Sequence, residues 1–148
     1  MGDTLKARAL RLLSMREHSR AELARKLGAA GEAHEIEAVL DRLEALDLQS
    51  DSRFAQSYVR SRQARLGSRR LRHELQQKGI AEALIDTAMA STLEADDLAR
   101  AQDVWQKKFG QPPGDAREWA KQARFLQGRG FGADIIHRIL KDSHDEPA

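Results

Sequence analysis

The chain of 148 residues contains no cysteine. This absence excludes a disulfide framework, a thiolate metal site and a cysteine nucleophile, and it agrees with a reducing compartment. Apolar residues never continue for the roughly 20 positions of a membrane span, and the amino terminus lacks the basic and then apolar pattern of a signal peptide. We therefore expect a cytoplasmic protein without a membrane partner.

Proline and aromatic residues are scarce as well. Three prolines and 5% aromatic residues accompany 41% hydrophobic and 32% charged residues, a balance typical of a folded helical protein. The histidines lack the spacing of metal ligands. Residues 73–77 begin like a zinc-protease motif but have glutamine at its second histidine position. We expect no metal, no other cofactor, no catalytic residue and no small-molecule substrate.

Apolar residues recur at helical spacing through the first 49 residues. Leu5, Ala9 and Leu12 fall on one face of a first helix. Ser19 followed by Glu22 predicts an N-cap with a capping box for a second helix, and Gly31 is expected to end it. The pattern from residue 36 to residue 43 predicts a third helix, which completes a three-helix unit.

This three-helix pattern returns twice. Residues 23–31, a leucine pair followed by glycine, match residues 71–79 at an offset of 48, with Ser68 as the expected cap. Residues 75–85 match residues 126–136 at an offset of 51. In the third copy the prolines at 112 and 113 are expected to break the first helix, and Asp115 is expected to cap the second.

The sequence therefore predicts an all-α protein of three tandem three-helix repeats in an elongated, curved array. We expect the repeats to cover residues 1–49, 50–92 and 93–142, with a flexible tail at 143–148. Units of this size have marginal cores on their own, so each repeat is expected to pack on its neighbour.

Positive charge is concentrated in the second repeat. Between Arg60 and Lys78, seven cations and the single acid Glu74 give a net charge of +6, whereas the whole chain carries only +2. Such a segment is suited to phosphates or to an acidic protein surface. Helical spacing predicts that Arg62, Arg65 and Arg69 form a row. The binding candidates are Arg60, Arg62, Arg65, Arg69, Arg70, Arg72 and Lys78.

The aromatic side chains and the glycines at 128–132 are better explained by packing and helix termination than by ligand binding. Most aromatic residues fall on the apolar helix faces, which favours core packing over base stacking, although Trp119 is expected to be partly exposed. The glycines at 128–132 resemble a phosphate-binding loop, but no strand precedes them and no lysine with serine or threonine follows. We interpret Gly130 as a helix stop.

An ordered set of motifs resembles the RecX family of regulatory proteins. The second repeat supplies Phe54, Ala55, Tyr58, Val59, Arg60, Arg62, Gly67, Arg70, Leu71, Glu74, Leu75, Lys78, Gly79 and Ile80. The third supplies Lys107, Lys108, Phe109, Gly110, Arg124, Phe125, Leu126, Arg129, Gly130, Phe131, Ile135 and Leu140. One departure is that the acidic pair usual before the phenylalanine is reduced here to Asp51.

The resemblance implies a non-enzymatic modulator of the RecA recombinase. RecX proteins lodge in the helical groove of the RecA–single-stranded-DNA filament and restrain its ATPase, strand-exchange and co-protease activities. It implies RecA as the partner, weak binding to single-stranded DNA alone, and a monomer. Secondary binding candidates are Lys107, Lys108, Lys121, Arg124 and Arg129. The alternative is a helical-repeat protein that binds DNA non-specifically and needs no recombinase.

Overall fold

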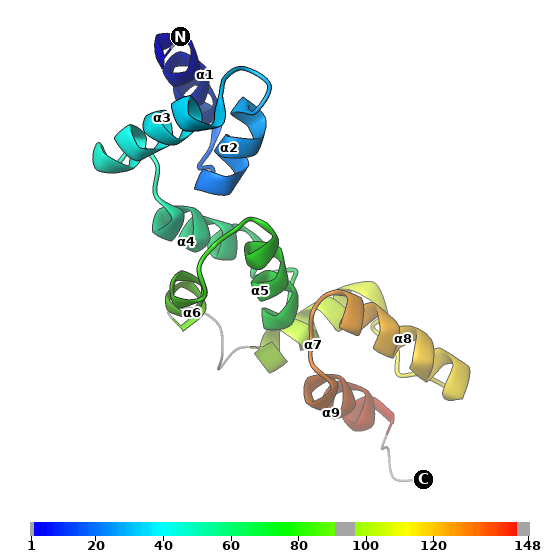
Figure 1. Cartoon of the computed structure of the whole chain (residues 1–148). Coiled ribbons are helices and arrows are strands. Elements are labelled where there is room, and N and C mark those ends of the chain that lie inside the picture. Colours follow the sequence, from blue (N-terminus) through cyan, green and yellow to red (C-terminus); the bar gives the residue numbers. More distant parts are fainter. Residues whose placement is uncertain (1, 91–96, 145–148) are drawn as a thin grey trace. The chain divides into compact units, whose positions relative to one another are not determined.

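The computed structural model describes residues 2–90 and 97–144, and every regular element within these ranges is an α-helix (Figure 1). The helices are α1 (Gly2–Met15), α2 (Arg20–Leu27), α3 (Ala33–Ala45), α4 (Asp51–Arg62), α5 (Ser68–Gln77), α6 (Glu82–Ala90), α7 (Asp97–Lys108), α8 (Ala116–Gly128) and α9 (Ala133–His144). No helix in these ranges is long and apolar enough to cross a membrane. The predicted all-α fold is confirmed there. Residues 93–96 of the predicted third repeat and 145–148 of the predicted tail lie outside the described residues.

The chain divides into two compact units. One consists of Met1–Tyr58 with Leu75–Ala88, and the other of Val59–Glu74 with Met89–Ala148. The division runs through α4 and α5, so the second repeat contributes residues to both units. We refer to them as the first and the second unit.

The helices α1, α2 and α3 of the first unit enclose one hydrophobic core. Its buried members are Leu5, Ala9, Leu23, Leu27, Ile36, Leu40 and Leu43. The predicted capping box is present, because the Ser19 hydroxyl accepts from the Glu22 N–H while the Glu22 carboxylate accepts from the Ser19 N–H.

The predicted end of α2 at Gly31 is wrong, because the helix already ends at Leu27 with Gly28 as its C-cap. Gly31 has a packing role instead. A Cβ atom at this position would lie 2.8 Å from a methyl group of Leu5, so the missing side chain lets α1 approach the α2–α3 connection closely. Sequence spacing alone does not distinguish these two uses of glycine.

The helices α7, α8 and α9 of the second unit form another core. Its buried members are Ala101, Val104, Trp105, Leu126, Phe131, Ile136, Ile139 and Leu140. As predicted, the first helix ends before the prolines, and Asp115 caps α8 by accepting from the Glu118 N–H at 2.8 Å. Trp119 is half-buried and lies against the ring of His137, with 5.3 Å between the ring centroids.

Glycines follow α5 and α8 in the left-handed conformation. Gly79 has φ of 79° and Gly130 has φ of 95°, so the prediction of two glycine stops is confirmed. Ser68 was predicted to precede α5 as its cap, but it is the first residue of the helix. Its hydroxyl donates to the carboxylate of Asp97 at 2.9 Å and thereby joins α5 to α7.

Candidate anion-binding site

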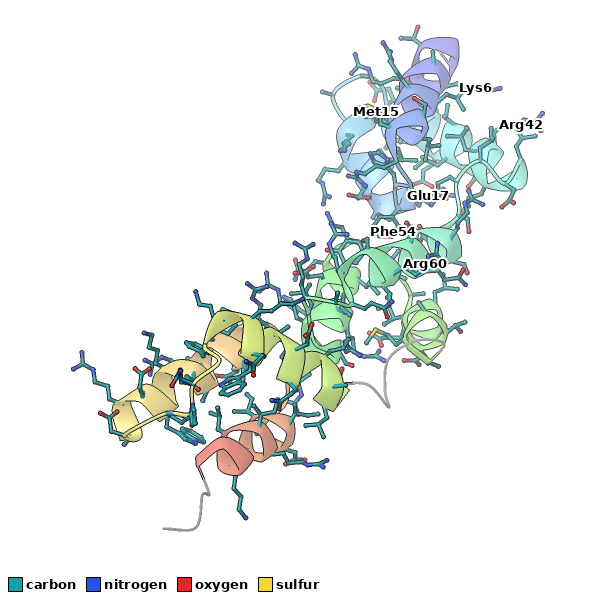
Figure 2. All side chains as sticks on the ribbon, turned by 180° about the vertical axis from the view of Figure 1, so that it is seen from behind. Lys6, Met15, Glu17, Arg42, Phe54 and Arg60 are labelled. Atoms are coloured by element: carbon teal, nitrogen blue, oxygen red, sulfur yellow. The ribbon has the colours of Figure 1, made fainter. Side chains whose placement is uncertain are left out.

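The predicted basic residues are distributed over α4, the turn after it, α5 and the turn after α5. Arg60 and Arg62 lie in the last turn of α4, where Arg60 is exposed (Figure 2). Arg65 follows in the turn that leads to α5. The helix α5 then carries Arg69, Arg70 and Arg72, and Lys78 lies just beyond its end.

Three of these arginines surround a hollow in the second unit, and Arg129 joins them from the turn after α8. The hollow has a volume of about 410 Å³, and we call it the arginine hollow. It is lined by Arg62, Arg65, Leu66, Arg70, Glu74 and Arg129. Four guanidinium groups and one carboxylate give this lining a formal charge of +3. Such a concentration of arginine favours the binding of phosphate or carboxylate oxygens.

Local contacts fix the orientation of Arg70 and Arg129. Arg70 donates through Nη1 to the backbone carbonyl of Gly128 at 2.7 Å and through Nε to Glu74 at 2.8 Å. The guanidinium of Arg129 lies over the ring of Phe125, 5.0 Å from its centroid. These contacts use only part of the five N–H groups that each guanidinium carries.

Backbone hydrogen bonds bring Arg129 to the second repeat. The Gly67 N–H donates to the Arg129 carbonyl at 2.7 Å, and the Arg69 N–H donates to the Gly130 carbonyl at 3.2 Å. The two segments approach so closely that a Cβ atom on Gly67 would lie 2.4 Å from the Gly130 oxygen. Gly67 and Gly130 can approach this closely because neither has a side chain, and their contact places Arg129 beside the arginines of the second repeat.

Arg69 and Arg72 line a different hollow of about 360 Å³. Its lining also contains the carboxylates of Asp97 and Asp134, so the formal charges balance there. The guanidinium of Arg69 lies against Gly132, where an added Cβ atom would be 3.3 Å from its Nε. The expected row of Arg62, Arg65 and Arg69 is thus divided between two hollows.

Lys78 belongs to the first unit and contacts the α2 helix. Its ammonium group donates to Glu22 at 3.2 Å, and its backbone carbonyl accepts from the Ser19 hydroxyl at 2.8 Å. Glu22 also accepts from both Nη atoms of Arg16, at 3.2 and 3.1 Å. This predicted binding residue therefore has a role in packing α2 against the turn after α5.

The electrostatics of Glu22 follow from these contacts. Its side chain is only 2% exposed, and burial by itself raises the pKa of a carboxyl group. Hydrogen bonds from Arg16, the Ser19 N–H and Lys78 outweigh burial and lower the pKa of Glu22 to about 2. Glu22 is therefore a buried, ionised counterion for two cations.

The secondary candidates have separate positions in the second unit. Lys107 forms an exposed ion pair with Asp103 at 3.1 Å, and Lys108 lies over the Phe125 ring at 5.4 Å from its centroid. Lys121 and Arg124 are exposed on α8. Arg129 is the member of this group that the arginine hollow includes, and neither charge density nor helical spacing singles it out.

Comparisons with known proteins agree with this architecture. Family models match three parts of the chain: the RecX first three-helix domain at residues 6–43, the second at 50–89 and the third at 94–140. Regulatory protein RecX of Leptothrix cholodnii is 49% identical over 140 residues, covering 93% of this chain and 88% of the relative. Regulatory protein RecX of Chromobacterium violaceum is 45% identical over 146 residues, covering 98% and 94%.

Solved structures support the same assignment. A crystal structure of regulatory protein RecX superimposes with a TM-score of 0.79 at 25% identity, covering 95% of this chain and 73% of that one. RecX from Lactobacillus salivarius has the same fold, with a TM-score of 0.79 at 22% identity and coverage of 98% and 97%. With three matching domains and relatives that are nearly half identical, the chain belongs to the RecX family of regulatory proteins.

Proposed function

We propose that this protein is a non-enzymatic regulator of RecA that binds in the groove of the RecA–single-stranded-DNA filament. Binding there inhibits ATP hydrolysis, strand exchange and co-protease activity, and so modulates DNA repair, recombination and the SOS response. The protein acts as a cytoplasmic monomer and needs no cofactor. Family membership supports the regulatory role, and the arginine hollow is the observation that supports the filament as its target.

The arginine hollow suits a target that consists of DNA and protein. A guanidinium group binds phosphate or carboxylate oxygens through two parallel hydrogen bonds, and a filament presents both kinds of group along its groove. Among the described residues, Arg60, Arg65 and Arg69 form no ion pair with an acidic side chain. Their charge is available to a partner, so we expect binding to weaken as salt concentration rises.

The decisive experiment is a titration of filament ATPase activity. RecA filaments are assembled on single-stranded DNA with ATP, and hydrolysis is measured as the protein is added. We expect hydrolysis to slow to a low plateau and strand exchange to fall in parallel. Unchanged hydrolysis and strand exchange at saturating protein would exclude the regulatory role proposed here.

Non-specific DNA binding without a recombinase is the second candidate function, and the same excess of arginine favours it. The two functions differ in their preferred target. A filament regulator binds assembled filaments more tightly than naked single-stranded DNA of equal length. Equal affinity for the two, measured at one salt concentration, would favour the simple DNA-binding function.

A further inference from the structure

Consecutive repeats make contact through equivalent positions at two places in the chain. In the first junction, the start of α2 contacts the turn after α5, and the Ser19 hydroxyl donates to the Lys78 carbonyl at 2.8 Å. In the second junction, the start of α5 contacts the turn after α8, and the Gly67 N–H donates to the Arg129 carbonyl at 2.7 Å. The offsets of 48 and 51 residues between the repeats relate these two contacts.

Both junctions also use the glycine that follows the accepting carbonyl. A Cβ atom on Gly79 would lie 2.7 Å from the Cβ of Ala21, and one on Gly130 would lie 2.2 Å from the Cβ of Arg70. Each junction thus needs a left-handed glycine against the first turn of a helix from the preceding repeat. The two glycine contacts differ by one position, because Ala21 corresponds to Arg69 at the offset of 48 residues and Gly130 meets Arg70.

The first junction contains its own anion. Glu22 is almost fully buried there and accepts hydrogen bonds from Arg16, Lys78 and the Ser19 N–H, at 3.0–3.2 Å. Its carboxylate therefore serves as the shared counterion of the two cations that gather where the two repeats meet. This junction carries an internal anion at its centre.

The second junction has cations at the equivalent positions. Glu22 corresponds to Arg70 at the offset of 48 residues, and Lys78 corresponds to Arg129 at the offset of 51. Arg62 and Arg65 lie around the same hollow, where Glu74 is the single carboxylate. The place that an internal carboxylate occupies in the first junction is thus an open, positively charged hollow in the second.

We propose that the arginine hollow binds a phosphate group of single-stranded DNA, which supplies the anion that Glu22 supplies in the first junction. The inference rests on the proposed function and names one interaction within it. Leu66 is the single apolar residue of the lining, so the hollow lacks the apolar centre that a docked protein segment uses. Arginine forks and an open hollow suit a phosphodiester, whose neighbours along the strand can reach other exposed arginines.

The variant Arg70→Glu tests this proposal by giving the second junction the carboxylate of the first. The new carboxylate lies beside Arg129 and competes with phosphate for it. We expect affinity for a fluorescein-labelled oligothymidine of about 15 nucleotides to fall roughly ten- to hundredfold, measured by fluorescence anisotropy. The dependence of the logarithm of affinity on the logarithm of salt concentration should become shallower by about 0.7 for each phosphate that the variant no longer binds.

Two further variants make the result specific. Arg11→Glu on α1 has the same change of charge on an exposed residue outside the arginine hollow, and it should leave oligothymidine affinity within about twofold of the original. Arg129→Gln removes one guanidinium and keeps the backbone carbonyl of the junction, so it should weaken binding without unfolding. Circular dichroism and thermal melting check that all three variants are folded.

The possible results distinguish a failure of the phosphate site from a failure of the proposed regulatory function. Oligothymidine affinity unchanged in both Arg70→Glu and Arg129→Gln would overturn the phosphate site, whatever the filament ATPase shows. If the variants keep their oligothymidine affinity but no longer bind the filament, the hollow binds a protein carboxylate. That result also overturns the phosphate site. If the variants bind oligothymidine more weakly but the unmodified protein does not affect filament ATPase, the phosphate site is supported and the regulatory function is contradicted.

Discussion

At the scale of single residues, Glu22 is both a member of the capping box of α2 and a buried counterion. Its spacing from Ser19 predicts the capping box, and the structure confirms it. The bonds to Arg16 and Lys78 could not be predicted, because Lys78 lies 56 residues away and reaches α2 only through the contact between repeats. Local patterns predict local hydrogen bonds, whereas a buried ion cluster depends on tertiary packing.

The first prediction concerns the pH dependence of stability that Glu22 confers. Its pKa of about 2 in the folded protein lies below the ordinary value of 4.5, so its contribution is complete above pH 4.5 and is lost as pH falls towards 2. Glu22→Gln should lower the free energy of unfolding at neutral pH by on the order of 3 kcal/mol, measured by urea denaturation. The difference between the two proteins should shrink below pH 4.5.

Glu37→Gln is the matched control for this prediction. Glu37 also bonds to an arginine, Arg20, at 2.5 Å, but its side chain is 64% exposed. Solvent screens such a pair, so its removal should cost less than about 1 kcal/mol. Equal destabilisation by the two variants, or a constant difference across the acidic range, would contradict the assigned role of Glu22.

The second prediction concerns Gly130, whose backbone conformation would be strained for any other residue. Its φ of 95° and the 2.2 Å between an added Cβ and the Cβ of Arg70 leave Gly130→Ala no relaxed conformation. We expect it to destabilise the second unit by at least about 2 kcal/mol. Gly128→Ala, two residues earlier, meets no atom within 4 Å and should be neutral or stabilising by up to about 1 kcal/mol. Equal melting temperatures for the two variants would refute this account.

At the scale of elements, helix α8 depends on a buried polar residue. Gln122 occupies a position where the repeat pattern has leucine, and it is only 2% exposed. Its Oε1 accepts from the indole N–H of Trp105 at 2.8 Å, and its Nε2 donates to the carbonyl of Gln111 at 3.1 Å. One side chain thus connects α8 to α7 and to the loop between them.

The third prediction follows from this connection. Gln122→Leu restores the apolar pattern of the repeats but leaves the buried N–H of Trp105 without its partner and removes the hydrogen bond to the Gln111 carbonyl. We expect a decrease of about 1–3 kcal/mol in the free energy of urea unfolding and a shift in Trp105 fluorescence. Gln102→Leu, on the exposed face of α7, should change stability by less than about 0.5 kcal/mol. A more stable Gln122→Leu protein would show that the hydrogen bonds do not hold α8 in place.

Helix faces were predictable from the sequence, but the grouping of charges was not. Apolar spacing identified the faces of α1 and α3 because helical periodicity is a property of each segment alone. Arg69 was expected to continue the row of Arg62 and Arg65, yet the turn between α4 and α5 redirects the chain and places it at another hollow. Arg129 joins the arginines only through the contact between repeats.

At the scale of the whole molecule, the two junctions between repeats differ in their charge. A backbone carbonyl of the later repeat accepts at equivalent positions in both, from the Ser19 hydroxyl in the first junction and from the Gly67 N–H in the second. Glu22 lies at the first junction, and Arg70 has the equivalent position at the second. A buried ion cluster stabilises the first contact, whereas the second leaves a positively charged hollow. The charge that is concentrated in the second repeat is thus completed by Arg129 of the third repeat, which lines the same hollow.

The fourth prediction tests whether this geometry, rather than total charge, governs filament binding. Arg62→Gln, Arg65→Gln and Arg129→Gln, combined in one protein, remove three charges from the arginine hollow and keep polar side chains there. We expect much weaker inhibition of filament ATPase than with the original protein. Raising salt from about 50 to about 200 mM should weaken the original protein roughly fiftyfold if all four arginines of the hollow contact phosphate, and the triple variant should have a slope shallower by about 2, which is a loss of roughly threefold.

The matched control removes three charges from α1, through Lys6→Gln, Arg8→Gln and Arg11→Gln. If long-range attraction by net charge governs binding, the two triple variants lose inhibition equally, because their charges are equal. If the arginine hollow binds the filament, the α1 variant retains inhibition and the salt dependence of the original protein. Equal loss of inhibition in both variants would therefore assign filament binding to overall charge, while a loss confined to the hollow variant assigns it to the place where the second and third repeats meet.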